Sequence, residues 1–295
     1  MNKIYRLGLY EKATPSNISW EERLQSAASA GFDYMELSID ETDEREERLN
    51  WTVAQRKDIV RAMNNAGLRL ESMCLSGHRK WSLGSSDPEI RSRGLNIMHK
   101  ALLLAVDLGL RTIQLAGYDV YYEKSTNQTK AWFLENLLKS VDMASQVGVC
   151  LGFETMETPF MDTVEKAMRY INYVNSPYLG VYPDIGNLTN ASFLYNKSVA
   201  DDILSGNGHI FAAHLKETKI GKYRDLRFGE GTTDYEGALS ALIPQGVRRY
   251  VCEMWCHDAP DWRINIANAS LFARTKIEKQ MKLFLNENRK TLVTK

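Results

Sequence analysis

The chain has 295 residues, a length that a single α/β barrel commonly reaches, so length alone does not demand two domains. Its 37 acidic and 37 basic residues give zero formal net charge, and neither sign forms a long block, which argues against a nucleic-acid-binding arm or a polybasic membrane patch. The sequence lacks a signal-peptide-like start and any run of about 18 apolar residues, so we expect a soluble, cytoplasmic protein.

Short apolar runs alternate along the chain with longer segments of helical period, a pattern typical of repeated strand and helix units around a parallel sheet. Eight strands are predicted, over Ile4–Tyr10, Tyr34–Asp40, Arg69–Ser76, Thr112–Tyr118, Val149–Met156, Leu179–Asp184, Ile210–Lys216 and Tyr250–Trp255. Eight helices are predicted, over Trp20–Ala30, Val53–Ala66, Pro88–Leu108, Thr129–Gln146, Thr163–Val174, Ser198–Ser205, Tyr235–Ile243 and Ile264–Asn286.

This order and count predict the α/β class and a (β/α)8 TIM barrel, formed as a single domain by residues 1–295. Residues 286–295 read as a frayed tail. Local signals agree with the helix ends: Asp87 precedes Pro88 as a helix N-cap, and glycine follows several helices, where a left-handed C-cap is expected.

Each of the last four predicted strands is interrupted by one polar side chain, and the four are Glu154, Asp184, His214 and Glu253. They are spaced by about one strand-helix unit, and barrel active sites form at the carboxyl ends of the strands, so we expect them to converge. Taken singly, such a residue is often an ordinary ion-paired group. Together, three carboxylates repel unless a cation or protons intervene, which favours one divalent metal ion, Mn²⁺, Zn²⁺, Co²⁺ or Mg²⁺.

Several longer motifs occur in a characteristic order over nearly the whole chain: LGLYEKA, GFDYMELSIDETDER, MCLSGHRKWSLGS, IQLAGYDVYY, YPDIGNL, HLKETK, FGEG and EMW. In these motifs the chain resembles the L-ribulose-5-phosphate 3-epimerases, also called L-xylulose-5-phosphate 3-epimerases, within the xylose-isomerase-like barrels. The resemblance implies that the four polar residues are the metal ligands. It also implies inversion at C3 of a ketopentose 5-phosphate, in the degradation of L-ascorbate.

The residue chemistry agrees with that reaction. A metal that polarises the C2 carbonyl of a ketose acidifies the C3 proton and allows a cis-enediolate to form. Inversion then needs an acid or base on each face of the substrate. Glu154 and Glu253 belong to non-adjacent strands and are predicted to serve as these two groups.

Further polar residues near the strand ends are candidates for binding the sugar and its phosphate: Lys12, His78, Arg79, Tyr118, Lys216, Arg227 and Gly229. Cations suit a phosphate, and glycine backbone can approach an anion closely. Lys216 follows His214 by two residues and should face the same side of its strand. It could stabilise enediolate charge, or form a structural ion pair with Glu36 or Asp40.

Other functions stay open at this stage. An aldose-ketose isomerase of the hexulose-6-phosphate type shares the barrel, the metal and the enediolate, whereas a non-catalytic sugar-binding barrel needs no pair of bases. A barrel nuclease is disfavoured because it needs clustered histidines and a basic face. The expected partner is a small phosphorylated sugar, with no nucleic acid and no membrane. The number of subunits stays open, a homodimer being one option.

Overall fold

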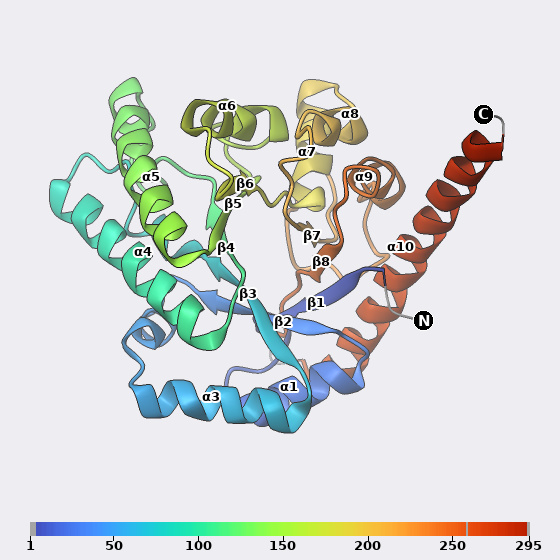
Figure 1. The fold of residues 1–295 in the computed structure, drawn as a ribbon, viewed down its shortest axis with the longest axis horizontal. Coiled ribbons are helices and arrows are strands. Elements are labelled where there is room, and N and C mark those ends of the chain that lie inside the picture. The colour runs from blue at the N-terminus through green and yellow to red at the C-terminus, as the bar shows by residue number, and fades with distance from the viewer. Residues whose placement is uncertain (1–3, 258, 294–295) are drawn as a thin grey trace.

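The computed structural model describes residues 4–257 and 259–293, and its eight parallel strands form one curled sheet (Figure 1). Around the barrel the strands follow the order β6-β5-β4-β3-β2-β1-β8-β7. Their bounds are β1 Arg6–Tyr10, β2 Tyr34–Ile39, β3 Arg69–Leu75, β4 Thr112–Ala116, β5 Cys150–Glu154, β6 Leu179–Val181, β7 Ala213–Leu215 and β8 Arg249–Cys252. Two single parallel bridges between the β6 and β7 segments, Val181 to Ile210 and Asp184 to His214, complete the circle.

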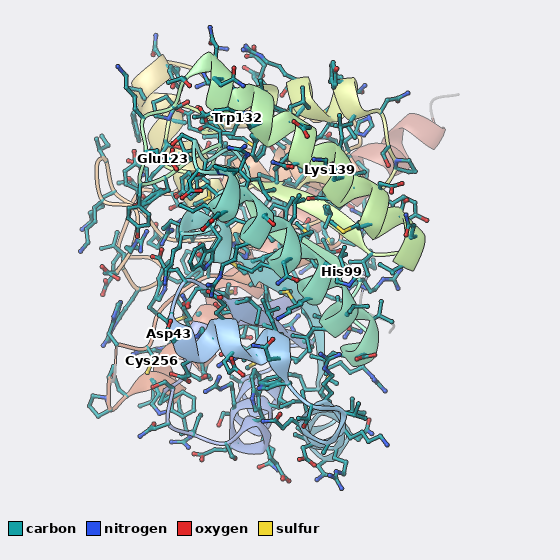
Figure 2. The ribbon with its side chains drawn as sticks, turned by 90° about the vertical axis from the view of Figure 1, so that its left-hand side faces the viewer. Asp43, His99, Glu123, Trp132, Lys139 and Cys256 are labelled. Atoms are coloured by element: carbon teal, nitrogen blue, oxygen red, sulfur yellow. The ribbon has the colours of Figure 1, made fainter. Side chains whose placement is uncertain are left out.

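Helices surround the strands on the outside of the barrel, as a parallel sheet requires for both of its faces to be buried (Figure 1). Figure 2 shows α4 and α5 side by side, with His99 on α4 and Trp132 and Lys139 on α5. The α-helices are α1 Trp20–Ser29, α2 Asp43–Glu46, α3 Val53–Ala66, α4 Pro88–Leu108, α5 Asn127–Val147, α6 Val164–Val174, α7 Ile185–Tyr195, α8 Val199–Leu204, α9 Tyr235–Leu242 and α10 Trp262–Val293. Short 3-10 helices follow β1, α2 and β3, and their bounds are η1 Glu11–Ala13, η2 Glu47–Asn50 and η3 Ser76–Arg79.

The barrel interior is packed with large side chains. Tyr34 and Tyr182 are fully buried there, and the hydroxyl of Tyr34 donates a hydrogen bond of 3.1 Å to the backbone carbonyl oxygen of Tyr250 in β8. Tyr34 and Tyr182 share one apolar cluster inside the barrel with Tyr10 and Cys74. Because this interior is a core and not a channel, a ligand can be received only at an end of the barrel.

The predicted class, the eight strands and their parallel order are confirmed. Two helices were not predicted, α2 and α7. The sixth strand ends at Val181, three residues earlier than predicted, because Asp184 turns the chain into α7. The seventh begins at Ala213, three residues later than predicted.

The predicted helix ends agree with the structure in their capping residues. The Asp87 side chain accepts the amide of Glu89 at 2.8 Å, with Pro88 in the first turn of α4. Gly67, Gly109 and Gly148 adopt left-handed C-caps with φ of 64°, 72° and 72°. The glycines therefore stop three helices where the chain turns back toward the next strand.

The last helix, α10, is longer than predicted. It continues to Val293, so most of the segment expected to fray from Asn286 is helical, while residues 294–295 lie outside the described part of the chain. Within residues 4–257 and 259–293, neither α10 nor any other helix combines the length and apolarity needed to cross a membrane.

Candidate metal centre and active site

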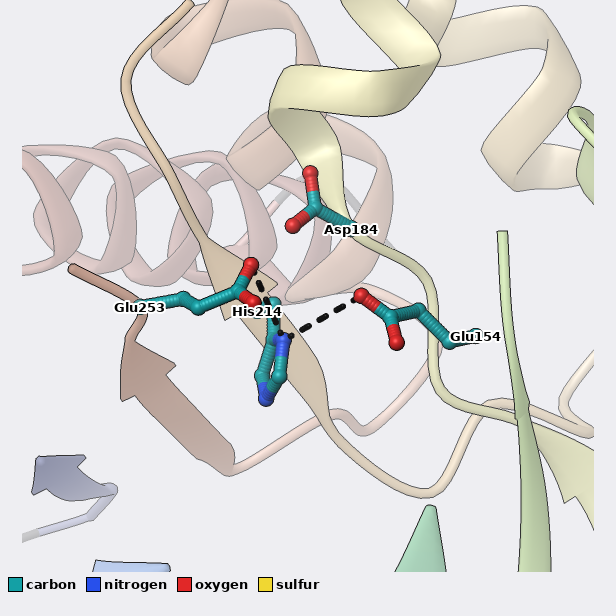
Figure 3. Close-up of side chains that lie close together, drawn as sticks. All are labelled: Glu154, Asp184, His214 and Glu253. Atoms are coloured by element: carbon teal, nitrogen blue, oxygen red, sulfur yellow. Dashed lines mark ion pairs between the residues drawn. The ribbon is translucent and has the colours of Figure 1, made fainter. Parts of the chain in front are cut away.

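The four polar residues of the last four strands meet at one end of the barrel (Figure 3). Glu154 is the last residue of β5, His214 is the middle residue of β7, and Glu253 directly follows β8. Asp184 is the N-cap of α7, where one carboxylate oxygen accepts the amide of Asn187 at 2.7 Å. One ligand atom from each of the four lies within 4.8 Å of the others, and all four side chains are buried.

The imidazole of His214 lies between two of the carboxylates (Figure 3). Its Nδ1 is 3.4 Å from Oε2 of Glu253 and 3.6 Å from Oε1 of Glu154. The ammonium of Lys216 is 2.9 Å from Oδ2 of Asp184 and 3.3 Å from Oε2 of Glu253. Lys216 therefore pairs with two residues of the cluster and not with Glu36 or Asp40, the partners considered from the sequence.

Burial sets the proton affinities of the cluster. It raises the pKa of Glu154, and it raises the pKa of Asp184 well above its ordinary value. Burial also opposes ionisation of Glu253, but the charges of Lys216 and His214 hold the pKa of that carboxyl well below its ordinary value. The three carboxyl groups therefore differ in pKa although they share one buried space: Glu154 and Asp184 bind a proton more readily than usual, and Glu253 less readily.

The residues fit a divalent cation. Oδ2 of Asp184 and Oε2 of Glu253 are buried and accept no hydrogen bond, although both face the ammonium of Lys216. Three carboxylates with one imidazole are ligands that Mn²⁺, Co²⁺, Zn²⁺ or Mg²⁺ can accept. The four residues can therefore offer these two oxygens to one metal ion, which would share them with the ammonium of Lys216.

A pocket opens above the cluster. Three cations predicted from the sequence line it, namely Lys12, Arg79 and Lys216. The remaining lining residues include both glutamates of the cluster and are Tyr10, Cys74, Ser76, Glu154, Met156, Glu157, Asn187, Tyr223, Arg224, Glu253 and Trp255. Cationic groups around a carboxylate cluster suit a small anionic ligand, and the aromatic side chains can pack against its C–H groups.

The cations at the pocket differ in how firmly they are held. Lys12 forms an ion pair of 2.5 Å with Asp40. The guanidinium of Arg79 lies over the ring of Tyr121, with 4.8 Å to its centroid, and its buried Nε has no hydrogen-bond partner. Its Nη1 is 3.8 Å from Oε1 of Glu41, a longer ion pair than that of Lys12, so Arg79 is the less firmly paired of the two cations and can bind a ligand oxygen.

Other candidates from the sequence lie outside the pocket lining. His78 is buried, with its Nε2 3.0 Å from the carbonyl oxygen of Gly94. The Tyr118 hydroxyl donates to Glu157 at 2.6 Å. Arg227 is an exposed partner of Asp261, and the Gly229 amide donates to Glu217 at 2.7 Å.

Sequence reasoning missed Glu36, Gln114, Glu157 and Arg224 as site residues. Glu36 and Gln114 lie within predicted strands, where a polar residue in an apolar run is a usable signal. Arg224 offers no such signal, because the loop after β7 also carries other basic residues, and the sequence does not tell which one turns inward.

Comparison with known proteins places the chain among sugar-converting barrels. Residues 24–281 match the model of the xylose isomerase-like TIM barrel family. The L-ribulose-5-phosphate 3-epimerase UlaE of Escherichia coli strain K12 is 44% identical over 280 residues, which cover 95% of this chain and 97% of that protein.

Two solved structures share the fold at low sequence identity. An L-ribulose 3-epimerase aligns with a TM-score of 0.76 and 19% identity, over 99% of this chain and 98% of that one. A D-psicose 3-epimerase aligns with a TM-score of 0.75 and 15% identity, over 92% of this chain and 99% of that one. At this identity the two structures support the barrel fold alone.

Proposed function

Because this chain belongs to the L-ribulose-5-phosphate 3-epimerases of the xylose isomerase-like TIM barrel family, and is a sugar epimerase, we propose that it interconverts L-ribulose 5-phosphate and L-xylulose 5-phosphate. The observation that carries the proposal is the pair of buried carboxylates, Glu154 and Glu253. They approach the same point from β5 and from the end of β8, with the Nδ1 atom of His214 between them (Figure 3).

In the proposed mechanism the two glutamates divide the proton transfer. With a divalent ion held by Glu154, Asp184, His214 and Glu253, the C2 carbonyl of the substrate would be polarised and its C3 proton acidified. One glutamate removes the C3 proton, and the other delivers a proton to the opposite face of the cis-enediolate. The roles exchange for the other epimer. The ammonium of Lys216 adds positive charge beside the developing enediolate.

Solvent deuterium exchange tests the two bases separately. Glu154→Gln and Glu253→Gln keep an oxygen ligand and the side-chain shape but remove one base each, so each variant should lose epimerisation by about 100-fold or more. Each should still exchange the C3 proton of one epimer with deuterium through the remaining glutamate, and the two variants should prefer opposite epimers. Mass spectrometry of both sugars measures this, with metal content determined in parallel. Equal exchange of both epimers by both metal-loaded variants would rule out the two-base mechanism.

The alternative functions are separated by the products. An aldose-ketose isomerase would return the proton to the neighbouring carbon and form an aldose phosphate, and a binding barrel would exchange no C3 proton at all. Incubation of the wild-type protein with L-ribulose 5-phosphate should give L-xylulose 5-phosphate, with no aldose phosphate. Metal analysis of the purified protein would identify the ion.

We also propose that Arg79 and Lys12 bind the phosphate, with Arg224 as a third cation of the same pocket. Arg79→Gln should raise KM for the phosphorylated sugar about 10-fold or more with a smaller change in kcat, because a remote group binds substrate and transition state alike. Arg169→Gln, which alters an exposed arginine on α6, is the control and should leave both constants unchanged. A raised KM in Arg227→Gln together with normal kinetics in the Arg79 and Lys12 variants would move the phosphate to the Arg227–Gly229 loop.

A further inference from the structure

Glu36 lies in the middle of β2, on the opposite side of His214 from the carboxylate cluster, and is fully buried. Its Oε1 is 2.6 Å from Nε2 of His214. Its Oε2 accepts hydrogen bonds from the hydroxyls of Ser72, at 2.6 Å, and Tyr182, at 2.9 Å. Among the described residues, no lysine or arginine forms an ion pair with it. A buried carboxylate held in this way, from three other strand segments, has a fixed direction toward His214.

That direction decides which nitrogen of His214 carries a proton. An ionised carboxylate can only accept hydrogen bonds, so a 2.6 Å contact with Nε2 requires the proton on Nε2. The side-chain amide of Gln114 lies at nearly equal distances from the two ring nitrogens, 3.1 and 3.2 Å, and favours neither. In the neutral ring the lone pair is then on Nδ1, the nitrogen that faces Glu154 and Glu253 (Figure 3).

We propose that Glu36 is a positioning residue that holds His214 as the Nε2–H tautomer and aims its Nδ1 lone pair at the metal. The inference rests on the proposed metal site. Ser72 and Tyr182 complete the arrangement, because they occupy the other carboxylate oxygen and prevent the Glu36 side chain from turning away. A carboxylate behind a metal-bound imidazole fixes the ring and strengthens it as a ligand, and loss of such a partner typically lowers metal affinity 10–100-fold.

Two substitutions of Glu36 separate this role from simple filling of the core. Glu36→Gln keeps an oxygen that can accept from Nε2 but removes the charge, so the Kd for Mn²⁺ should rise about 10-fold. Glu36→Leu removes the acceptor, so the Kd should rise about 100-fold and the ring proton should no longer be confined to Nε2. Glu71→Gln is the matched control, because Glu71 is also a glutamate on a barrel strand, β3, but its carboxylate pairs with Arg6 and Arg249 and not with His214. Its Mn²⁺ affinity should equal that of the wild type.

The readouts are Mn²⁺ binding by electron paramagnetic resonance and the nitrogen shifts of the ¹⁵N-labelled His214 ring in Zn²⁺-loaded protein. The wild type should show a protonated Nε2 and a metal-bound Nδ1, and this measurement needs no variant that might misfold. Ser72→Ala, which loosens Glu36 without touching His214, should weaken Mn²⁺ binding less than Glu36→Leu does. Unchanged Mn²⁺ affinity in both Glu36 variants, or a metal-bound Nε2 in the wild type, overturns the inference alone. A wild-type protein that binds no Mn²⁺ overturns it together with the proposed metal site.

Discussion

His78 is buried behind the loop that carries Arg79, and its Nε2 is 3.0 Å from the carbonyl oxygen of Gly94. A carbonyl oxygen only accepts hydrogen bonds, so Nε2 donates in the neutral ring. Burial lowers the pKa of His78 to about 4, well under its ordinary value near 6.5. The residue was a candidate for substrate binding, but its contacts tie η3 to α4 instead.

This burial predicts a loss of stability in acid. Between pH values of about 6.5 and 4 the unfolded chain binds a proton on His78 that the folded chain does not, so stability should fall as the pH falls through this window, by about 3 kcal/mol in total. Urea unfolding of the wild type and of His78→Gln, at about pH 7 and about pH 4.5, measures the effect. The stability of the wild type relative to the variant should decrease on acidification. His99→Gln, an exposed histidine of α4, is the control. An equal stability difference at both pH values would contradict the assignment.

The meeting of Glu154, Asp184, His214 and Glu253 could be predicted, because each is polar at an otherwise apolar predicted strand and each follows the last by about one strand-helix unit. Glu36 meets the first condition but not the second. Its partner His214 is 178 residues away in sequence, and only closure of the barrel brings β2 opposite β7. The sequence therefore shows that Glu36 is polar within an apolar strand, but it does not show that its partner is His214.

The loop between β3 and α4 rests on the helix that follows it, at Gly94. A β-carbon at this position would lie 2.5 Å from the carbonyl oxygen of Trp81 and 3.1 Å from a methyl group of Leu83. Alanine within a helix is usually favoured over glycine by about 1 kcal/mol. Here the contact is with backbone, which cannot move without displacing the loop that carries Arg79.

Gly94→Ala should therefore destabilise the protein, by about 1–3 kcal/mol, in spite of the better helix propensity of alanine. Because the loop must shift, KM for the sugar phosphate should also rise. Ser92→Ala, at an exposed position two residues earlier in α4, offers the control and should be neutral or slightly stabilising. Denaturant unfolding and steady-state kinetics test the pair. A Gly94→Ala variant as stable as Ser92→Ala would show that the loop has room to adjust.

Helix α7 shows where pattern reading fails at the scale of an element. Its sequence, IGNLTNASFLY, mixes leucine and alanine with the weaker helix formers glycine, asparagine, threonine and serine. Its first seven residues are all buried, so no polar face alternates with an apolar one. The helix is specified by its start, where the Asp184 side chain caps the amide of Asn187. Asp184 was predicted as the last residue of the sixth strand, whereas the structure ends β6 at Val181 and makes Asp184 the N-cap of α7.

At the scale of the whole molecule, the barrel could be predicted from the repeated order of strands and helices alone. That order survives local errors, such as the shortened β6 and β7, because each unit still contributes one strand to the count. The arrangement of the pocket could not be predicted in the same way. Its cations come from loops after β1, β3 and β7, whose path depends on turns that the apolar pattern does not record.

One joint of the barrel differs from the other seven. Neighbouring strands elsewhere share ladders of three or more paired residues, whereas the β6 and β7 segments meet through two single bridges. One of those bridges joins Asp184 to His214, which belong to the metal cluster. An ion bound by both residues would fasten the barrel at its most weakly paired seam. Separation of the β6 and β7 segments would then release the ion, and the ion would hold the two segments together. The enzyme would stay active for as long as this contact stays closed.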